Sequence, residues 1–71
     1  SGEYDLSIIQ TELLKLIRNK GEISVSDVAI KMALPLGEAR AYLYSLIHKG
    51  LIKTNLNQED LTCNPLVWCN D

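Results

Sequence analysis

The residues best suited to chemistry gather on one predicted helix, where Arg40 and Tyr44 stand four positions apart. That spacing puts both side chains on one helical face. Lys49 follows the helix, Lys53 lies on the next segment, and Lys31 precedes the helix and can flank the same surface. Arg and Lys hold phosphates, and a tyrosine ring stacks on a base or donates a hydrogen bond. The alternative is that Arg40 is a solvated helix residue and Tyr44 is half-buried packing.

The remaining reactive residues do not form a catalytic or metal-binding set. His48 is the single histidine, and no glycine-rich phosphate loop is present. Cys63 and Cys69 lie six apart, so on one strand they would be about 20 Å apart, too far for a disulfide. Two cysteines and one distant histidine also fall short of a zinc site. We therefore expect a domain that is not an enzyme, with no cofactor, and thiols kept reduced inside the cell (cytoplasm, nucleus or mitochondrion).

The chain has 71 residues, of which 46% are hydrophobic and 23% charged, which is typical of one small folded domain. Its apolar runs are far shorter than the ~20 residues that a membrane span needs. Residues 1–4 are expected to be a disordered tail, since Ser1-Gly2 resembles what a protease leaves after cleaving a tag. Residues 5–71 are expected to form the single domain.

The charge balance argues against a uniformly basic surface. Seven Lys/Arg stand against nine Asp/Glu, which gives a net charge of −2. Because nucleic-acid-binding domains usually carry a basic excess, such a function requires a locally basic face. Glu59 and Asp60, at the predicted tip of the C-terminal hairpin, would repel a phosphate backbone there.

The first elements can be placed from local signals. Apolar residues recur every three or four positions over residues 6–20, which predicts a helix. Asp5 or Ser7 can cap its start, and Gly21 suits its end. Residues 22–24 are expected to be a short extended bridge.

Two further helices and a hairpin should follow. Ser24 and Asp27 form a capping-box pattern for a helix of about 25–33, and Pro35 favours the first turn of a helix of about 36–49. The third helix would bury Leu36 or Ala39, Leu43, Leu46 and Ile47, and would present Gly37, Arg40, Ala41, Tyr44 and His48 on its other face. Residues 51–55 and 61–69 are strand candidates around a polar turn at 57–60, with Pro65 marking an edge or a bulge. This order predicts an α+β winged helix-turn-helix with a small antiparallel sheet.

Two stretches resemble a known family. Residues 35–51, P-L-G-E-A-R-A-Y-L-Y-S-L-I-H-K-G-L, are similar to P-K-K-E-I-N-R-V-L-Y-S-L-x-K-K-G of the Zα family of Z-DNA- and Z-RNA-binding winged helices. Residues 64–68, N-P-L-V-W, look like that family's T-P-P-L-W on the last strand, and residues 27–32 align with D-L-x-x-K-L. The resemblance extends from about residue 8 to 69.

The resemblance implies shape-selective binding of left-handed double-stranded DNA or RNA through the third helix and the wing. It assigns Tyr44 to the edge of a syn purine, Trp68 to the support of that ring, Pro65 to the sugar-phosphate backbone and Lys49 to a phosphate. It also leads us to expect that the Tyr44 and Trp68 rings pack against each other.

The chain departs from the family pattern at four positions. Leu36 replaces a lysine, Arg40 an asparagine, Ala41 an arginine and Leu66 a proline. Each lost cation removes a phosphate contact. Two alternatives therefore stay open: a winged helix that contacts another protein, and a transcription regulator whose helix enters the major groove of right-handed DNA.

If the domain binds nucleic acid, its charged side chains should be segregated. The basic side chains Lys31, Arg40, Lys49 and Lys53 should gather on one face around the third helix. Glu12 and Glu22 should lie away from that face. Acids spread evenly over the same face would favour protein contact.

Overall fold

The structure is a computed structural model, and it describes residues 6–55 and 63–70. Its elements are α1 (Ile8–Lys20), β1 (Glu22–Ser24), α2 (Val25–Met32), α3 (Leu36–His48), β2 (Ile52–Thr54) and β3 (Leu66–Cys69). This confirms the predicted winged helix-turn-helix of three helices and a small antiparallel sheet. The predicted tail at residues 1–4, the alternative cap Asp5 and the turn that holds Glu59 and Asp60 lie outside the described residues.

The start and end of α1 follow the predicted signals. Ser7, rather than Asp5, caps the helix: its Oγ accepts the Gln10 amide N–H at 3.1 Å, and Gln10 Oε1 accepts the Ser7 amide N–H at 3.2 Å. Gly21 ends the helix with φ of 83°, a conformation that residues with a Cβ avoid. Both signals lie within the helix and its flanks, so they could be read from the sequence.

The sheet has the order β1-β3-β2, with both pairings antiparallel, so the last strand is the central one. Val67 lies opposite Ile23 on one side and Thr54 on the other. The sequence predicted an edge strand or a bulge at Pro65, and this prediction is wrong because β3 is the central strand. Pro65 comes directly before this strand, a position where its missing N–H costs no pairing.

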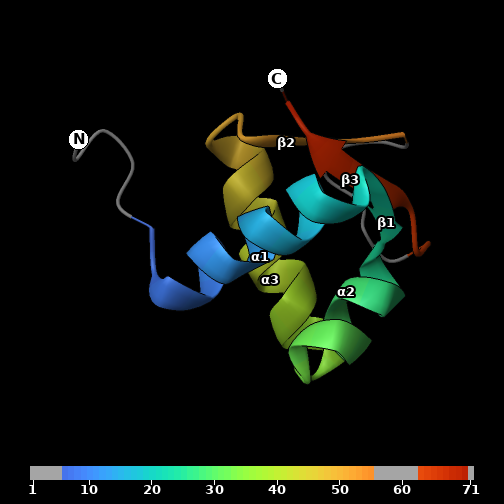
Figure 1. Ribbon diagram of the computed structural model, residues 1–71. Coiled ribbons are helices and arrows are strands. Elements are labelled where there is room, and N and C mark those ends of the chain that lie inside the picture. Colours follow the sequence, from blue (N-terminus) through green and yellow to red (C-terminus); the bar gives the residue numbers. More distant parts are fainter. Residues whose placement is uncertain (1–5, 56–62, 71) are drawn as a thin grey trace.

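The core lies between the helices and the inner face of the sheet. Figure 1 shows α1 crossing in front of α3, with the three strands gathered at one end of the helices. Leu36 is 43% exposed, so Ala39 takes the buried position that the sequence left open between them. The core consists of Leu13, Ile17, Ile23, Val25, Val28, Ala29, Ala39, Leu43, Leu46, Ile47, Ile52 and Val67.

Candidate nucleic-acid interface

The outer face of α3 is the surface that the fold leaves open. Because Leu43, Leu46 and Ile47 are buried, the opposite side of the helix faces outward. That side carries Gly37, Arg40, Ala41, Tyr44 and His48, as the sequence predicted. We call these five residues the α3 outer face. Gly37 and Ala41 are exposed, and a Cβ built on Gly37 would meet no atom within 4 Å. A partner can therefore approach the first half of the helix closely.

The start of α3 differs from the starts of the other two helices. Its N-cap residue is Pro35, and no side chain among the described residues caps the helix. The first amide groups of a helix carry partial positive charge, which favours an anionic partner. Glu38 adds one carboxylate in the first turn. The open amides and the small outer residues lie at the same end of α3.

The polar groups of α3 are held rather than freely solvated. Arg40 and Tyr44 are both half-buried, and Tyr44 packs against the core. Lys49, just past the helix end, donates from Nζ to Ser45 Oγ at 3.1 Å. Half-buried donors lose less freedom on binding than fully exposed ones, so this arrangement suits recognition.

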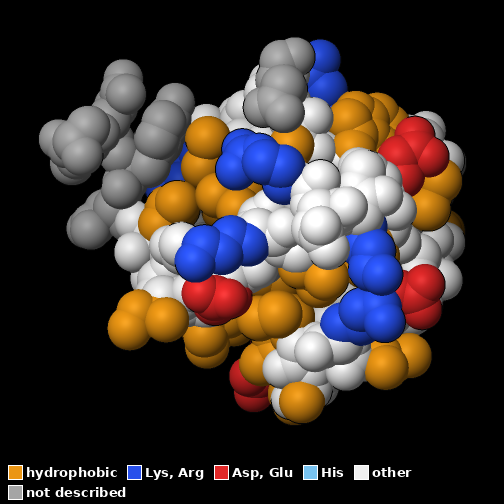
Figure 2. Space-filling view, in the orientation of Figure 1, with side chains coloured by type: hydrophobic (Ala, Val, Ile, Leu, Met, Phe, Trp, Pro, Cys, Tyr) orange, Lys and Arg blue, Asp and Glu red, His pale blue; other side chains and the backbone are white. Residues whose placement is uncertain are grey.

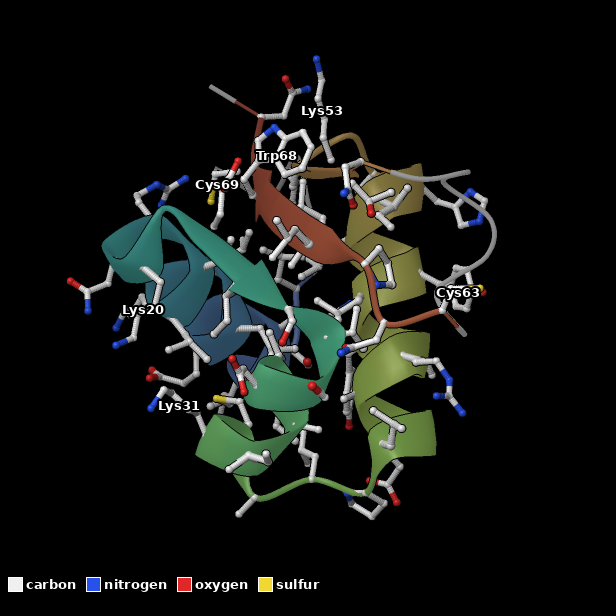
Figure 3. All side chains as sticks on the ribbon, turned by 90° about the vertical axis from the view of Figure 1, so that its right-hand side faces the viewer. Lys20, Lys31, Lys53, Cys63, Trp68 and Cys69 are labelled. Atoms are coloured by element: carbon white, nitrogen blue, oxygen red, sulfur yellow. The ribbon has the colours of Figure 1, made fainter. Side chains whose placement is uncertain are left out.

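A second row of side chains crosses the sheet. In the strand register, Trp68 lies between Glu22 on β1 and Lys53 on β2. Val67 points into the core, so the alternation of a strand places Trp68 on the outer face. Figure 3 shows Trp68 and Lys53 at the same end of the molecule. The predicted contact between the Tyr44 and Trp68 rings stays a prediction.

The predicted segregation of charge is wrong in two respects. Glu22 was expected to lie away from the site, but the pairing of β1 with β3 brings it beside Trp68. Lys31 was expected to flank α3, but Figure 3 shows it near Lys20, on the opposite side of the molecule from α3. The side chain of Lys31 leaves α2 on the side of the molecule away from α3, so Lys31 does not belong to the candidate interface.

Pro65 also differs from its expected role. The resemblance implied that its ring touches a sugar-phosphate backbone, but the residue is buried. Its carbonyl accepts the Val25 amide N–H at 3.1 Å. Pro65 therefore joins the strand to α2 instead of facing a partner.

The protein is not basic overall, since seven Lys/Arg stand against nine Asp/Glu. The basic side chains also occupy two sides: Figure 2 shows Lys and Arg scattered over the α1 side, and Arg40, Lys49 and Lys53 belong to α3, its end and β2. The basic face around α3 is therefore a modest one.

Cys63 and Cys69 are not joined in a disulfide. Cys63 is exposed, and Cys69 is half-buried with Sγ 3.9 Å from the Leu14 carbonyl oxygen. Across residues 6–55 and 63–70, no three His, Cys, Asp or Glu side chains are grouped to hold a metal ion. No helix in this part of the chain has the length and apolarity required to cross a membrane.

One residue of structural importance was not singled out by the sequence. Asn64 accepts the Ser26 amide N–H on its Oδ1 at 2.8 Å, across 38 positions of the chain. Its φ of 54° is left-handed, a conformation that asparagine adopts more readily than most residues. An asparagine just before Pro65 was the available signal, but its partner could not be read from the sequence.

The fold has several relatives of known sequence or structure. The chain is 36% identical over 58 residues to the HTH-type transcriptional regulator YfiV of Bacillus subtilis (strain 168), a match that covers 82% of this chain and 36% of that protein. Its structure is similar to FabT of Streptococcus pneumoniae in complex with DNA, with a TM-score of 0.83, 21% identity and coverage of 99% of this chain and 48% of that one. A mutant MarR from E. coli complexed with operator DNA gives a TM-score of 0.79 at 24% identity, covering 93% of this chain and 46% of that one.

These relatives correct the family expected from the sequence. The neighbours in structure are winged helices of MarR and FabT, and the curated relative is a helix-turn-helix regulator, so the resemblance to the Zα family is wrong. Two of the motif residues that it relied on serve packing here, because Leu46 lies in the core and Tyr44 packs against it. The chain spans 36% of the curated relative and about half of the solved structures. The model of one family, the PCI domain, matches residues 1–64, and the chain belongs to that family.

Proposed function

We propose that this winged helix binds right-handed, B-form DNA, as part of a transcription regulator. The observation that carries the proposal is the α3 outer face, on which the small residues Gly37 and Ala41 lie beside hydrogen-bond donors such as Arg40. In a helix-turn-helix, α2 and α3 would be the paired helices and α3 the one that enters the major groove. Two of the structural relatives are complexes with DNA, and the curated relative is named a transcriptional regulator, which supports this assignment.

The chemistry of the α3 outer face fits a major-groove reader. The groove is about 12 Å wide and admits an α-helix. Gly37 and Ala41 let the backbone approach the base edges, and the Ala41 methyl group can contact a thymine methyl group. Arg40 can donate to guanine or to a phosphate, while the uncapped start of α3 can receive another phosphate. Lys49 and Lys53 would hold the backbone at the other end of the helix.

The test is selection of binding sites from a pool of random B-form duplexes, followed by fluorescence anisotropy at two salt concentrations. We expect a preferred sequence and an affinity that falls with salt. Arg40→Ala should weaken binding about tenfold or more, because it removes a charged contact to base or backbone. Arg18→Ala on α1 is the matched control and should change affinity little. Failure to bind any duplex at low salt would refute the proposal.

Contact with another protein is the second candidate, and one observation favours it. Ile30 is 74% exposed and Leu36 is 43% exposed, on the two sides of the turn between α2 and α3. Exposed apolar side chains of this size are more usual at a protein interface than beside phosphates. Ile30→Asp separates the two candidates, since it leaves the α3 outer face intact. If α3 binds DNA, Ile30→Asp should change the DNA affinity by no more than one added negative charge does.

A further inference from the structure

The start of α2 is completed by residues that come directly before β3. The first helical amide, of Val25, donates to the Pro65 carbonyl at 3.1 Å, and the next, of Ser26, donates to Asn64 Oδ1 at 2.8 Å. These amides are among the groups that a helix cannot satisfy by itself. Figure 1 shows the segment entering β3 beside the start of α2. A part of the chain that is distant in sequence therefore caps this helix.

The local sequence provides the third bond. Ser24 Oγ accepts the Asp27 amide N–H at 3.2 Å, which is one of the two bonds of the predicted capping box. Together the three acceptors satisfy the first three amide groups of α2. This helix start is thus used inside the protein, in contrast to the uncapped start of α3.

The backbone of Asn64 is shaped for this contact. Its φ of 54° turns the chain sharply just before Pro65 and brings the side chain back over α2. Asparagine is one of the few residues that enter this region without a large penalty. Asn64 therefore supplies both the turn and the hydrogen-bond acceptor.

A second asparagine makes a comparable bond that stays within the hairpin. Asn55 Oδ1 accepts the Leu66 amide N–H at 3.1 Å, and Thr54 Oγ1 donates to the Leu66 carbonyl at 2.8 Å. These bonds tie the strand that leaves the sheet to the strand that returns. They fix the base of the hairpin but do not reach α2.

We propose that Asn64 is a positioning residue that locks the wing, by which we mean the paired strands β2 and β3, onto the helix-turn-helix. Because α2 packs on α3, this bond adds to the β1–β3 pairing in setting the position of the wing relative to α3, the proposed DNA-reading helix. The wing and the α3 outer face then meet a duplex as one preformed surface, which reduces the ordering cost of binding. The role rests on the proposed DNA binding, whereas the lock itself does not.

The first experiment tests the lock without DNA, by amide hydrogen exchange in the 71-residue chain. Asn64→Gly keeps the left-handed turn and removes the acceptor, so the Ser26 amide should exchange about fivefold faster. Asn64→Asp keeps an acceptor and should restore slow exchange. Asn55→Gly, the matched control, should speed exchange at Leu66 and leave Ser26 unchanged. Unchanged exchange at Ser26 in Asn64→Gly would overturn the lock.

The second experiment tests positioning, with a double-mutant cycle on the duplex that the selection yields. Lys53→Ala should weaken binding by about fivefold in the wild type, because it removes one phosphate contact from the wing. In the Asn64→Gly background the same change should weaken binding by less than about twofold, since the wing is then held less firmly, by the β1–β3 pairing and the Val25–Pro65 bond. Additive effects would overturn the positioning role. A wild-type chain that binds no duplex would instead refute the proposed function, and the exchange result would still decide the lock.

Discussion

The first helix and the helix pair that follows it are completed in different ways. Ser7 and Gln10 cap the start of α1 and Gly21 ends it, and all three residues lie within or beside the helix. α2 borrows acceptors from Asn64 and Pro65, far along the chain. A helix with local caps can persist when its surroundings loosen, whereas one with borrowed caps depends on the assembled domain.

The ends of the pair show the same contrast. α2 ends at Ala33 with φ of 55°, where α1 has a glycine, and α3 begins without a side-chain cap. Alanine in the left-handed region is strained, and an uncapped start leaves amide groups unsatisfied. The end of α2 and the start of α3 are therefore weakly stabilised by local interactions. The helix pair depends instead on side-chain packing in the core.

The largest effect on stability should come from shortening the buried side chains that hold the helices together. Leu13 in α1 and Leu46 in α3 are both fully buried, so Leu13→Ala and Leu46→Ala should each lower the free energy of unfolding by about 2–5 kcal/mol. Urea unfolding measures both losses. Hydrogen exchange should show the amides of α3 opening first in Leu46→Ala. A loss below about 1 kcal/mol at Leu46 would contradict the dependence of α3 on packing.

The next effect concerns binding rather than stability. Ala41→Glu places a carboxylate on the α3 outer face, where it repels phosphates and fills the space beside the helix. DNA affinity should fall by about tenfold or more, with little change in unfolding midpoint. Thr11→Glu adds the same charge to an exposed position of α1 and is the control. Equal losses for both variants would show that net charge, and not the face of α3, controls binding.

A smaller effect tests the local cap of α1. Ser7→Ala removes the acceptor for the Gln10 amide and should cost about 1 kcal/mol. For a domain of this size, that loss corresponds to a fall in melting temperature of about 4–8 °C. Thermal unfolding followed by circular dichroism measures it. DNA affinity should stay at the wild-type value, and a reduced affinity would show that α1 contributes to the interface.

The smallest effect should be a gain. Ala33→Gly relieves the left-handed strain at the end of α2, although glycine also adds freedom to the unfolded chain. We expect the free energy of unfolding to rise by about 0.5 kcal/mol, measured by urea unfolding. Gly21→Ala is the reciprocal change at the end of α1 and should destabilise. A loss of stability in Ala33→Gly would mean that the Ala33 methyl group packs favourably in the turn.

The sequence predicted the fold because the signals that set it are local. Ser7, Gly21, Ser24 and Pro35 mark helix ends by side-chain chemistry and backbone geometry, and each prediction agrees with the structure within about two residues. The order of strands is different, because it depends on which strand reaches the middle of the sheet. Nothing near Pro65 reveals that β3 is central.

The candidate site was predicted where it lies on one helix and was missed where it depends on tertiary structure. Helical spacing is enough to place Arg40, Ala41 and Tyr44 together. The prediction for Lys31 was wrong because its side chain leaves α2 on the side of the molecule away from α3, and that orientation depends on how the two helices pack. The bond of Asn64 joins residues 38 positions apart, beyond the reach of any periodic pattern.

The central position of β3 has a consequence for the order in which the domain folds. β1 and β2 do not pair with each other, so neither has a partner strand until residues 66–69 arrive between them. Ser24 pairs with Leu66, so a long segment must close before β1 can join β3, whereas Thr54 and Val67 pair across a short hairpin. The entropic cost of closing the long segment must be met before its contacts form. The helices and the β2–β3 hairpin can therefore form early, whereas the pairing of β1, and with it the cap of α2, should form late.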